Sequence, residues 1–222
     1  MKNDYVYLKT KLSLQSPLNN RRTTLSMTRI TFALAIILSL AFTPLAAQEN
    51  DCDGWMSSDR EVTEQFWEAV TSEKVSDCLK SGSDINAKDD DGASPLHFAA
   101  FNNENPDVLT VLLNAGADVN GRGRFGGTPL LFAAFRNENP NVLKALLDAG
   151  ADLNARISTG NTPLHLVAKN NVNPEILTVL LDAGADATAV NEDGETPFDL
   201  AKDNEALVGT DAYRALNDAR FE

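Results

Sequence analysis

Thr162-Pro163-Leu164-His165 is one of four copies of a short motif that recurs along this chain of 222 residues. Successive copies lie 34 residues apart, and two sets of glycines keep the same spacing. Three markers that share one period indicate a chain built from stacked repeats. The other copies are Ser94-Pro95-Leu96-His97, Thr128-Pro129-Leu130-Leu131 and Thr196-Pro197-Phe198-Asp199, and the glycines are Gly82, Gly116, Gly150 and Gly184, and Gly92, Gly126, Gly160 and Gly194.

Each unit is predicted to contain two short helices. The Ser or Thr of the motif caps the first helix, and the proline takes its first position, where it loses no hydrogen bond. In the unit that starts at Gly92, this helix is expected over residues 96–101. The second helix starts with Asn105 as its cap and Pro106 at its first position, and it ends at Gly116. Its apolar residues fall at helical spacing, at Val108, Leu109, Leu112 and Leu113.

These motifs resemble those of the ankyrin repeat, whose signature is Thr-Pro-Leu-His-x-Ala. The end of that repeat is also present, as Gly116-Ala117-Asp118-Val119-Asn120. The resemblance implies an all-α ankyrin-repeat solenoid of helix-turn-helix units joined by β-hairpin loops. The chain departs from the usual pattern in its period of 34 rather than 33 and in an Asn-Pro pair between the helices, which is similar to a bacterial, exported type.

The resemblance runs from about Phe66 to the C-terminus. It divides residues 61–222 into an N-terminal cap (61–91), three repeats (92–125, 126–159 and 160–193) and a C-terminal cap (194–222). In the N-terminal cap, the segment from Phe66 to Val70 is aligned with residues 96–100, and a second helix is expected over 73–80 with Ser72 as its cap. The last helix is expected to begin near Thr210.

An apolar run from Ile30 to Phe42 precedes the repeats and follows a basic segment. Its length of 13 residues, with small residues after it, is typical of a secretory signal peptide and short for a membrane span. We expect residues 1–47 to be an N-terminal extension and signal peptide cleaved after Ala47, with Met27 as an alternative start, and residues 48–60 to be a linker. Arg21-Arg22 suggests the twin-arginine route instead, although Thr24 stands where that motif prefers Phe.

The formal charge is −13, and it is unevenly distributed. After residue 47 the chain has 13 basic and 31 acidic residues, a net charge of −18. Such a surface argues against nucleic acid or an anionic membrane as a partner. We expect a monomer with no membrane contact beyond the signal segment.

The chain has two cysteines, Cys52 and Cys78, and both follow the signal segment. An even number in an exported chain indicates a disulfide. Cys78 takes the register position of Leu112, which faces the core. The alternative is a pair of unlinked thiols.

No motif in the sequence predicts catalysis, a cofactor or a metal site. Gly121-Arg122-Gly123-Arg124-Phe125-Gly126 fits the dinucleotide pattern, but that pattern requires a βαβ unit and here it lies between two repeats. His97 and His165 lie two repeats apart, too far to share a zinc ion. Asp89-Asp90-Asp91-Gly92 lacks the ligand spacing of a calcium loop.

With no catalytic, cofactor or metal motif, the feature of the sequence that indicates a function is the protein surface. In ankyrin proteins the loop tips and the first helices grip a protein partner, and here the tips at 122–125 and 156–159 hold arginines and apolar residues on an acidic chain. Such residue types dominate protein interfaces, which favours a role in binding. The alternative interpretation is that Phe101 and Phe135 pack under the inter-helix loop and that the tips are solvated turns. The candidates for partner binding are Arg122, Arg124, Phe125, Arg156, Ile157, Phe101, Phe135 and Arg136.

The sequence therefore predicts a non-catalytic protein-binding module in the periplasm or secreted beyond it. The rival interpretation is a structural scaffold tethered to the inner membrane by an uncleaved signal. The partner is not identified by any motif.

Overall fold

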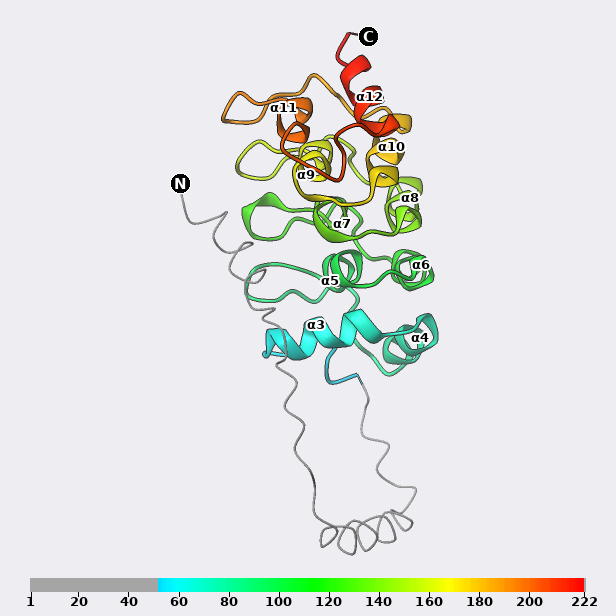
Figure 1. The fold of residues 1–222 in the computed structure, drawn as a ribbon. Helices are drawn as coiled ribbons and strands as arrows, with labels where there is room; N and C mark the ends of the chain where they lie inside the picture. The colour runs from blue at the N-terminus through cyan, green and yellow to red at the C-terminus, as the bar shows by residue number, and fades with distance from the viewer. Residues whose placement is uncertain (1–51, 222) are drawn as a thin grey trace, which may run out of the picture. The chain divides into compact units, whose positions relative to one another are not determined.

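A computed structural model describes residues 52–221, which form a stack of helix pairs (Figure 1). The signal segment and the alternative start at Met27 lie outside the described residues. The elements are α3 (Arg60–Ala69), α4 (Ser72–Lys80), α5 (Pro95–Asn102), α6 (Pro106–Asn114), the 3-10 turn η2 (Arg124–Gly126), α7 (Pro129–Arg136), α8 (Pro140–Asp148), α9 (Pro163–Asn170), α10 (Pro174–Asp182), α11 (Pro197–Ala201) and α12 (Asp211–Asp218).

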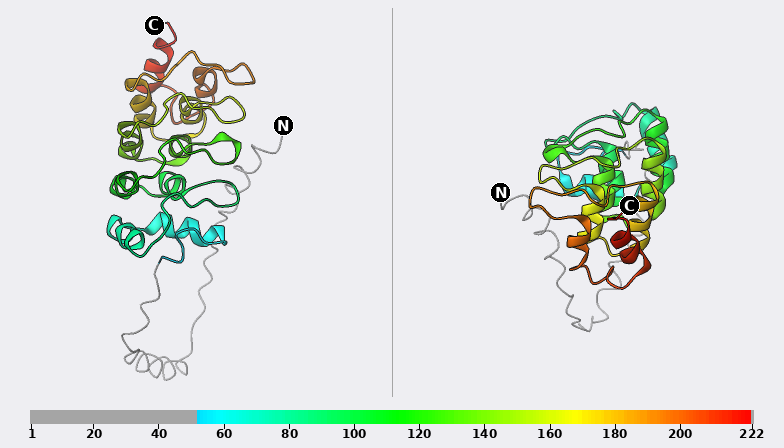
Figure 2. Two further views of the ribbon diagram at one scale, coloured as in Figure 1. Left: turned by 180° about the vertical axis from the view of Figure 1, so that it is seen from behind. Right: turned by 90° about the horizontal axis from the view of Figure 1, so that it is seen from above.

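The helices stand in two rows (Figures 1 and 2). The first row is α3, α5, α7, α9 and α11, and the second row is α4, α6, α8, α10 and α12. Neighbours contact one another along each row, and α5, α7, α9 and α11 also contact their second-row partners. This arrangement confirms the all-α ankyrin-repeat solenoid that the motifs predict.

The loops between repeats extend from the first row on the side away from the second row (Figure 1). No β-strand occurs among residues 52–221, so the expected hairpins are tight turns rather than strand pairs. Each turn is closed by a backbone hydrogen bond across four residues, such as Ile157 N–H to Asn161 O at 3.1 Å. Segments this short have no room for a ladder of paired strands. We call their tips finger 1 (residues 88–91), finger 2 (122–125), finger 3 (156–159) and finger 4 (190–193).

The helix starts follow the capping chemistry of the motif. Thr162 Oγ1 accepts a hydrogen bond from His165 N–H, and Pro163 occupies the first helical position. The second helix of a repeat starts in the same way with an Asn-Pro pair, as at Asn139, whose side chain accepts from Asn141 N–H. In the first unit the cap of α4 is Thr71 rather than the expected Ser72, which belongs to the helix.

The core lies between the two rows and repeats from unit to unit. Leu112, Leu146 and Leu180 occupy one position in three successive second-row helices, and all are fully buried. Burial of such a side chain contributes about 1.5–3 kcal/mol. Cys78 takes the same place in α4 and is also fully buried, as its register predicts.

A ladder of buried asparagines connects the repeats at the ends of the first-row helices. Asn137 Nδ2 donates to Ala100 O at 3.0 Å and to Asn103 O at 2.9 Å, both in the preceding repeat. Its Oδ1 accepts from Asn139 N–H at 3.0 Å within its own loop. Asn103, Asn171 and Asn204 make the same contacts in their units, so we call these four residues the asparagine ladder.

The ladder also corrects the predicted alignment of the first unit. Asn103 Nδ2 donates to Trp67 O and Val70 O, the places that Ala100 and Asn103 hold in the next unit. Trp67 therefore lies level with Ala100, and the alignment of Phe66 with Leu96 is wrong by three residues. The error arises because this unit lacks the Thr-Pro-Leu motif, and α3 starts instead at Arg60, within the segment expected as a linker.

The segment before α3 covers the first end of the stack. Trp55 is buried against Trp67 with ring centroids 5.0 Å apart, and Trp67 Nε1 donates to Trp55 O at 3.0 Å. A disulfide joins Cys52 to Cys78 in α4, with 5.7 Å between their Cα atoms. Residues 52–55 therefore belong to the N-terminal cap.

We expect Asn137→Ala to lower the free energy of unfolding by about 2–4 kcal/mol, because it leaves the carbonyls of Ala100 and Asn103 without this donor. Urea unfolding measures the change. The control is Asn141→Ala, an exposed residue of α8, which is expected to stay within about 0.5 kcal/mol of wild type. Equal stabilities of the two variants would contradict a structural role for the asparagine ladder.

Candidate partner-binding surface

Neighbouring fingers are joined to one another through their backbones. Ser158 N–H in finger 3 donates to Phe125 O in finger 2 at 2.9 Å, and Glu192 N–H in finger 4 donates to Thr159 O in finger 3 at 3.1 Å. Each bond joins residues 33 positions apart, so positions about one repeat period apart lie side by side, as the period predicts. Fingers 2, 3 and 4 therefore form a continuous strip along the first row of helices.

The arginines at the start of fingers 2 and 3 connect the strip. Arg122 Nη1 donates to Gly126 O and to Arg156 O, both at 3.3 Å. Arg156 Nη1 repeats the contact one unit later, to Gly160 O at 2.9 Å and Val190 O at 2.7 Å. Both side chains are exposed. These arginines therefore orient the fingers as well as supplying positive charge, a role that the sequence did not predict.

Phe125 at the tip of finger 2 has an unusual backbone. It lies in the turn Arg124–Gly126, its φ is 66°, and it is the one non-glycine residue with positive φ among those described. A bulky residue is strained in this region of φ and ψ, and its side chain is 49% exposed. Ile157 in finger 3 differs, because its side chain is half-buried and packs against the core.

The other candidates gather at the ends of α5 and α7. Phe101 stacks on Phe135 with ring centroids 6.3 Å apart and planes 7° from parallel. Phe132 meets the edge of Phe101 at 5.9 Å, and the guanidinium of Arg136 lies 5.0 Å from the Phe101 ring centroid. The three rings are half-buried and Arg136 is exposed, so this aromatic cluster (Phe101, Phe132, Phe135 and Arg136) is partly open to solvent.

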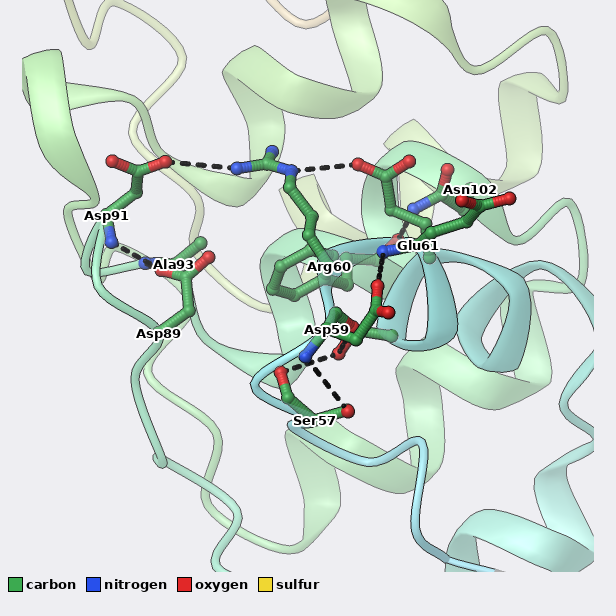
Figure 3. Close-up of polar contacts among 11 residues, drawn as sticks. Ser57, Asp59, Arg60, Glu61, Asp89, Asp91, Ala93 and Asn102 are labelled. Atoms are coloured by element: carbon green, nitrogen blue, oxygen red, sulfur yellow. Dashed lines mark hydrogen bonds and ion pairs between the residues drawn. The ribbon is translucent and has the colours of Figure 1, made fainter.

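Two residues near this surface were not among the candidates predicted from the sequence. Phe132 completes the aromatic cluster, and Arg60 of α3 lies with its guanidinium 5.8 Å from the Phe98 ring centroid and 3.0 Å from Asp91 Oδ2 of finger 1 (Figure 3). Phe132 lies 34 residues after Phe98, so the repeat period could have shown that an aromatic residue recurs at this position. Arg60 had no such signal, because the predicted alignment placed it before the first helix.

Charge separates the two rows of helices. Helices α5, α7 and α9 contain no acidic residue, and they carry Arg136 and Lys169. The second-row helices of the same repeats carry the acidic residues Asp107, Asp148, Glu175 and Asp182 and one basic residue, Lys144. The first-row helices in the middle of the stack are therefore apolar and basic, whereas their second-row partners have a net negative charge.

The two histidines lie under the fingers and are buried. His97 Nδ1 accepts from Ser94 N–H at 3.0 Å, so its Nε2 carries the proton and donates to Gly127 O at 3.2 Å. His165 makes the same pair of contacts with Thr162 N–H and Glu195 O. Burial lowers the pKa of each imidazole below its ordinary value of 6.5, and the hydrogen bond to the carbonyl opposes this only in part. Both rings are therefore neutral bridges between repeats.

Within residues 52–221, no group of three or more His, Cys, Asp or Glu side chains is placed to hold a metal ion. In the same part of the chain, no helix has the length and apolar character needed to cross a membrane.

Comparison with known families agrees with this geometry. A family model of ankyrin repeats in three copies matches residues 67–157, and one of ankyrin repeats in many copies matches residues 146–201. The chain belongs to the ankyrin-repeat proteins, whose repeats are generally protein–protein interaction modules and typically have no catalytic role. No curated protein sequence matches the chain.

The histidines predict how stability depends on pH. A pKa that is lower in the folded state means that the unfolded chain binds more protons below about pH 6.5, so stability falls as the pH drops through that value. Each histidine contributes a slope of up to about 1.4 kcal/mol per pH unit. Urea unfolding between pH 8 and pH 5 measures it.

The matched variant is His97→Leu with His165→Leu, because Leu131 fills the same position in the middle repeat. This variant is less stable overall, since two hydrogen bonds between repeats are lost, but its stability is expected to change less between pH 7 and pH 5.5. An unchanged slope would show that other groups control the dependence.

Proposed function

We propose that this chain is a non-catalytic binding module that holds a protein partner on the surface formed by fingers 2 and 3 and the aromatic cluster. The observation that carries the proposal is the half-exposed aromatic cluster on first-row helices that have no acidic residue. Interfaces are enriched in aromatic and arginine side chains, and ankyrin repeats bind protein partners.

The positive charge of this surface favours a partner with negative charge. Arg122, Arg136 and Arg156 are exposed on a chain with a net negative charge, so an acidic and partly apolar partner segment is favoured. Nucleic acid is disfavoured by the net charge, and the chain acts as a monomer until it meets its partner.

We also infer that the protein works in the periplasm or outside the cell. The signal-like segment motivates this, and the disulfide between Cys52 and Cys78 supports it, because such bonds persist in oxidising compartments. The rival proposal is a structural scaffold held at the inner membrane by the uncleaved segment.

Removal of the exposed ring at finger 2 is expected to weaken capture of the partner. Phe125→Gly removes the aromatic side chain and suits the positive φ, so it is expected to keep or raise stability. Binding is expected to weaken at least tenfold if Phe125 is an anchor. Capture from a periplasmic extract, followed by titration of the captured protein in low and high salt, measures the change.

The control is Phe221→Gly, which removes another exposed phenylalanine, 80% exposed beyond α12. Arg136→Ala tests the aromatic cluster separately. If Phe125→Gly, Arg136→Ala and the control all capture the same partner as wild type does, the proposed surface is wrong. Arg122 is not used in this test, because its bonds to the fingers would confuse stability with binding.

Export is tested by mass and by thiol content. The protein from the periplasmic fraction is expected to start near Gln48, lacking 47 residues or 21 counted from Met27, and to contain no free thiol. Intact mass with and without reductant and a thiol-labelling reagent measures both. A full-length protein in the membrane fraction would favour the tethered scaffold, and reactive thiols in a cytosolic protein would contradict export.

A further inference from the structure

The asparagine ladder marks one position that recurs along the first row of helices. Its side chains donate to one carbonyl in each of α3, α5, α7 and α9, and these carbonyls belong to Trp67, Ala100, Ala134 and Ala168. The residue that follows each carbonyl therefore holds the same register position in its unit. We call these four residues the first-row line: Glu68, Phe101, Phe135 and Lys169.

The first-row line is apolar in its middle and charged at its ends. The rings of Phe101 and Phe135 stack with their centroids 6.3 Å apart, so these two neighbours lie side by side. Both rings are half-buried, whereas Glu68 at one end and Lys169 at the other are exposed. A partner that lies along this line therefore meets a carboxylate, two rings and an ammonium group, in that order.

The helices that carry the line differ in charge in the same order. Helix α3 has three glutamates and one basic residue, Arg60. Helix α5 has no acidic or basic residue apart from the neutral His97, and α7 and α9 have one basic residue each, Arg136 and Lys169, and no acidic residue. The charge of the first row therefore changes from negative at α3 to positive at α7 and α9.

The ion pairs of the first row limit this change of sign to the stretch from α3 to α9. The guanidinium of Arg60 lies 2.9 Å from Glu64 Oε1 and 3.0 Å from Asp91 Oδ2, so the one positive charge of α3 is shared by two carboxylates (Figure 3). After α11, Lys202 is paired with Asp199 at 2.7 Å. The basic end of the line is therefore at α9 and not at the last helix of the row.

The length of the line sets the size of the segment that fits it. Packed helices lie about 8–10 Å apart, so the three steps from Glu68 to Lys169 span roughly 25–30 Å. An extended chain rises about 3.3 Å per residue, so a segment of roughly eight or nine residues covers this distance.

We propose that the first-row line binds a partner segment of mixed charge in one orientation. A basic residue of the segment lies toward Glu68, its apolar residues contact Phe101 and Phe135, and an acidic residue lies toward Lys169. The opposite orientation would bring like charges together at both ends, which disfavours it. The inference rests on the proposed function, and it adds the order of the charges in the partner and the direction in which the partner lies.

Synthetic peptides of nine residues test the order of charges without the natural partner. The mixed-charge peptide has two lysines at one end, Leu-Phe-Leu in the middle and two aspartates at the other end. In the acidic peptide aspartates replace the lysines, and in the neutral peptide serines replace all four charged residues. In ¹H–¹⁵N spectra at low salt, the mixed-charge peptide is expected to bind roughly three- to fivefold more tightly than either of the others, as exposed charge pairs would give.

The overall negative charge of the protein also repels the acidic peptide, so two single variants separate this effect from the local one. Glu68→Lys and Glu175→Lys change the net charge equally, but Glu175 lies on the second-row helix α10. Glu68→Lys is expected to remove the preference for the mixed-charge peptide over the acidic one. Glu175→Lys is expected to retain it.

A nitroxide spin label at the acidic end of the mixed-charge peptide reports its direction. In wild type, the label is expected to broaden amide signals of α9 more than those of α3. Glu68→Lys combined with Lys169→Glu exchanges the two ends at constant net charge, and it is expected to reverse this pattern. The matched control is Glu175→Lys with Lys144→Glu, the same exchange between two exposed second-row residues, which is expected to leave the wild-type pattern unchanged.

The outcomes distinguish this inference from the proposed function. Equal broadening of α3 and α9, or the same direction after the exchange of Glu68 and Lys169, would overturn the orientation. Equal binding of the acidic and mixed-charge peptides would do the same. If the peptides still shift signals of α5 and α7 in these cases, the partner surface stands, whereas no response of α5 and α7 to any peptide would contradict both proposals.

Discussion

The fold depends on a buried amide that two successive repeats share. In the asparagine ladder, each side chain gives both its N–H groups to carbonyls of the preceding repeat and accepts an N–H from its own loop. These carbonyls lie at the ends of first-row helices, where the helix itself offers no donor. A repeat that slipped by one residue would leave several buried polar groups unpaired, so the ladder sets the register between units while the leucines supply most of the burial energy.

The candidate surface is built on this register. Because the repeats are held in step, residues 34 positions apart come together, and the fingers can be joined by backbone bonds and by arginines that reach from one finger to the next. Part of the positive charge of the surface is therefore fixed in place before any partner arrives. Such ordering lowers the entropy that binding would otherwise lose.

The first end of the stack shows how a solenoid ends without a further repeat. Trp55 covers Trp67, and the disulfide ties this covering segment to α4. Terminal units need such protection because one of their faces has no neighbour. The last unit uses a different solution, in which Arg220 lies over the Phe198 ring at 3.9 Å.

The sequence by itself determined the repeats, the helix starts and the stacking of positions 34 apart, because capping residues, prolines and glycines act locally. It also named most of the residues on the candidate surface and both members of the disulfide. It did not reveal the asparagine ladder, the arginine bridges or the place of Phe132 in the aromatic cluster, and it misaligned Phe66. Those features depend on contacts between residues that lie 30 or more positions apart, as for Asn137 with Ala100 and Arg122 with Arg156. Only the tertiary structure decides which carbonyls these side chains reach, because the distance between two units depends on how their cores pack.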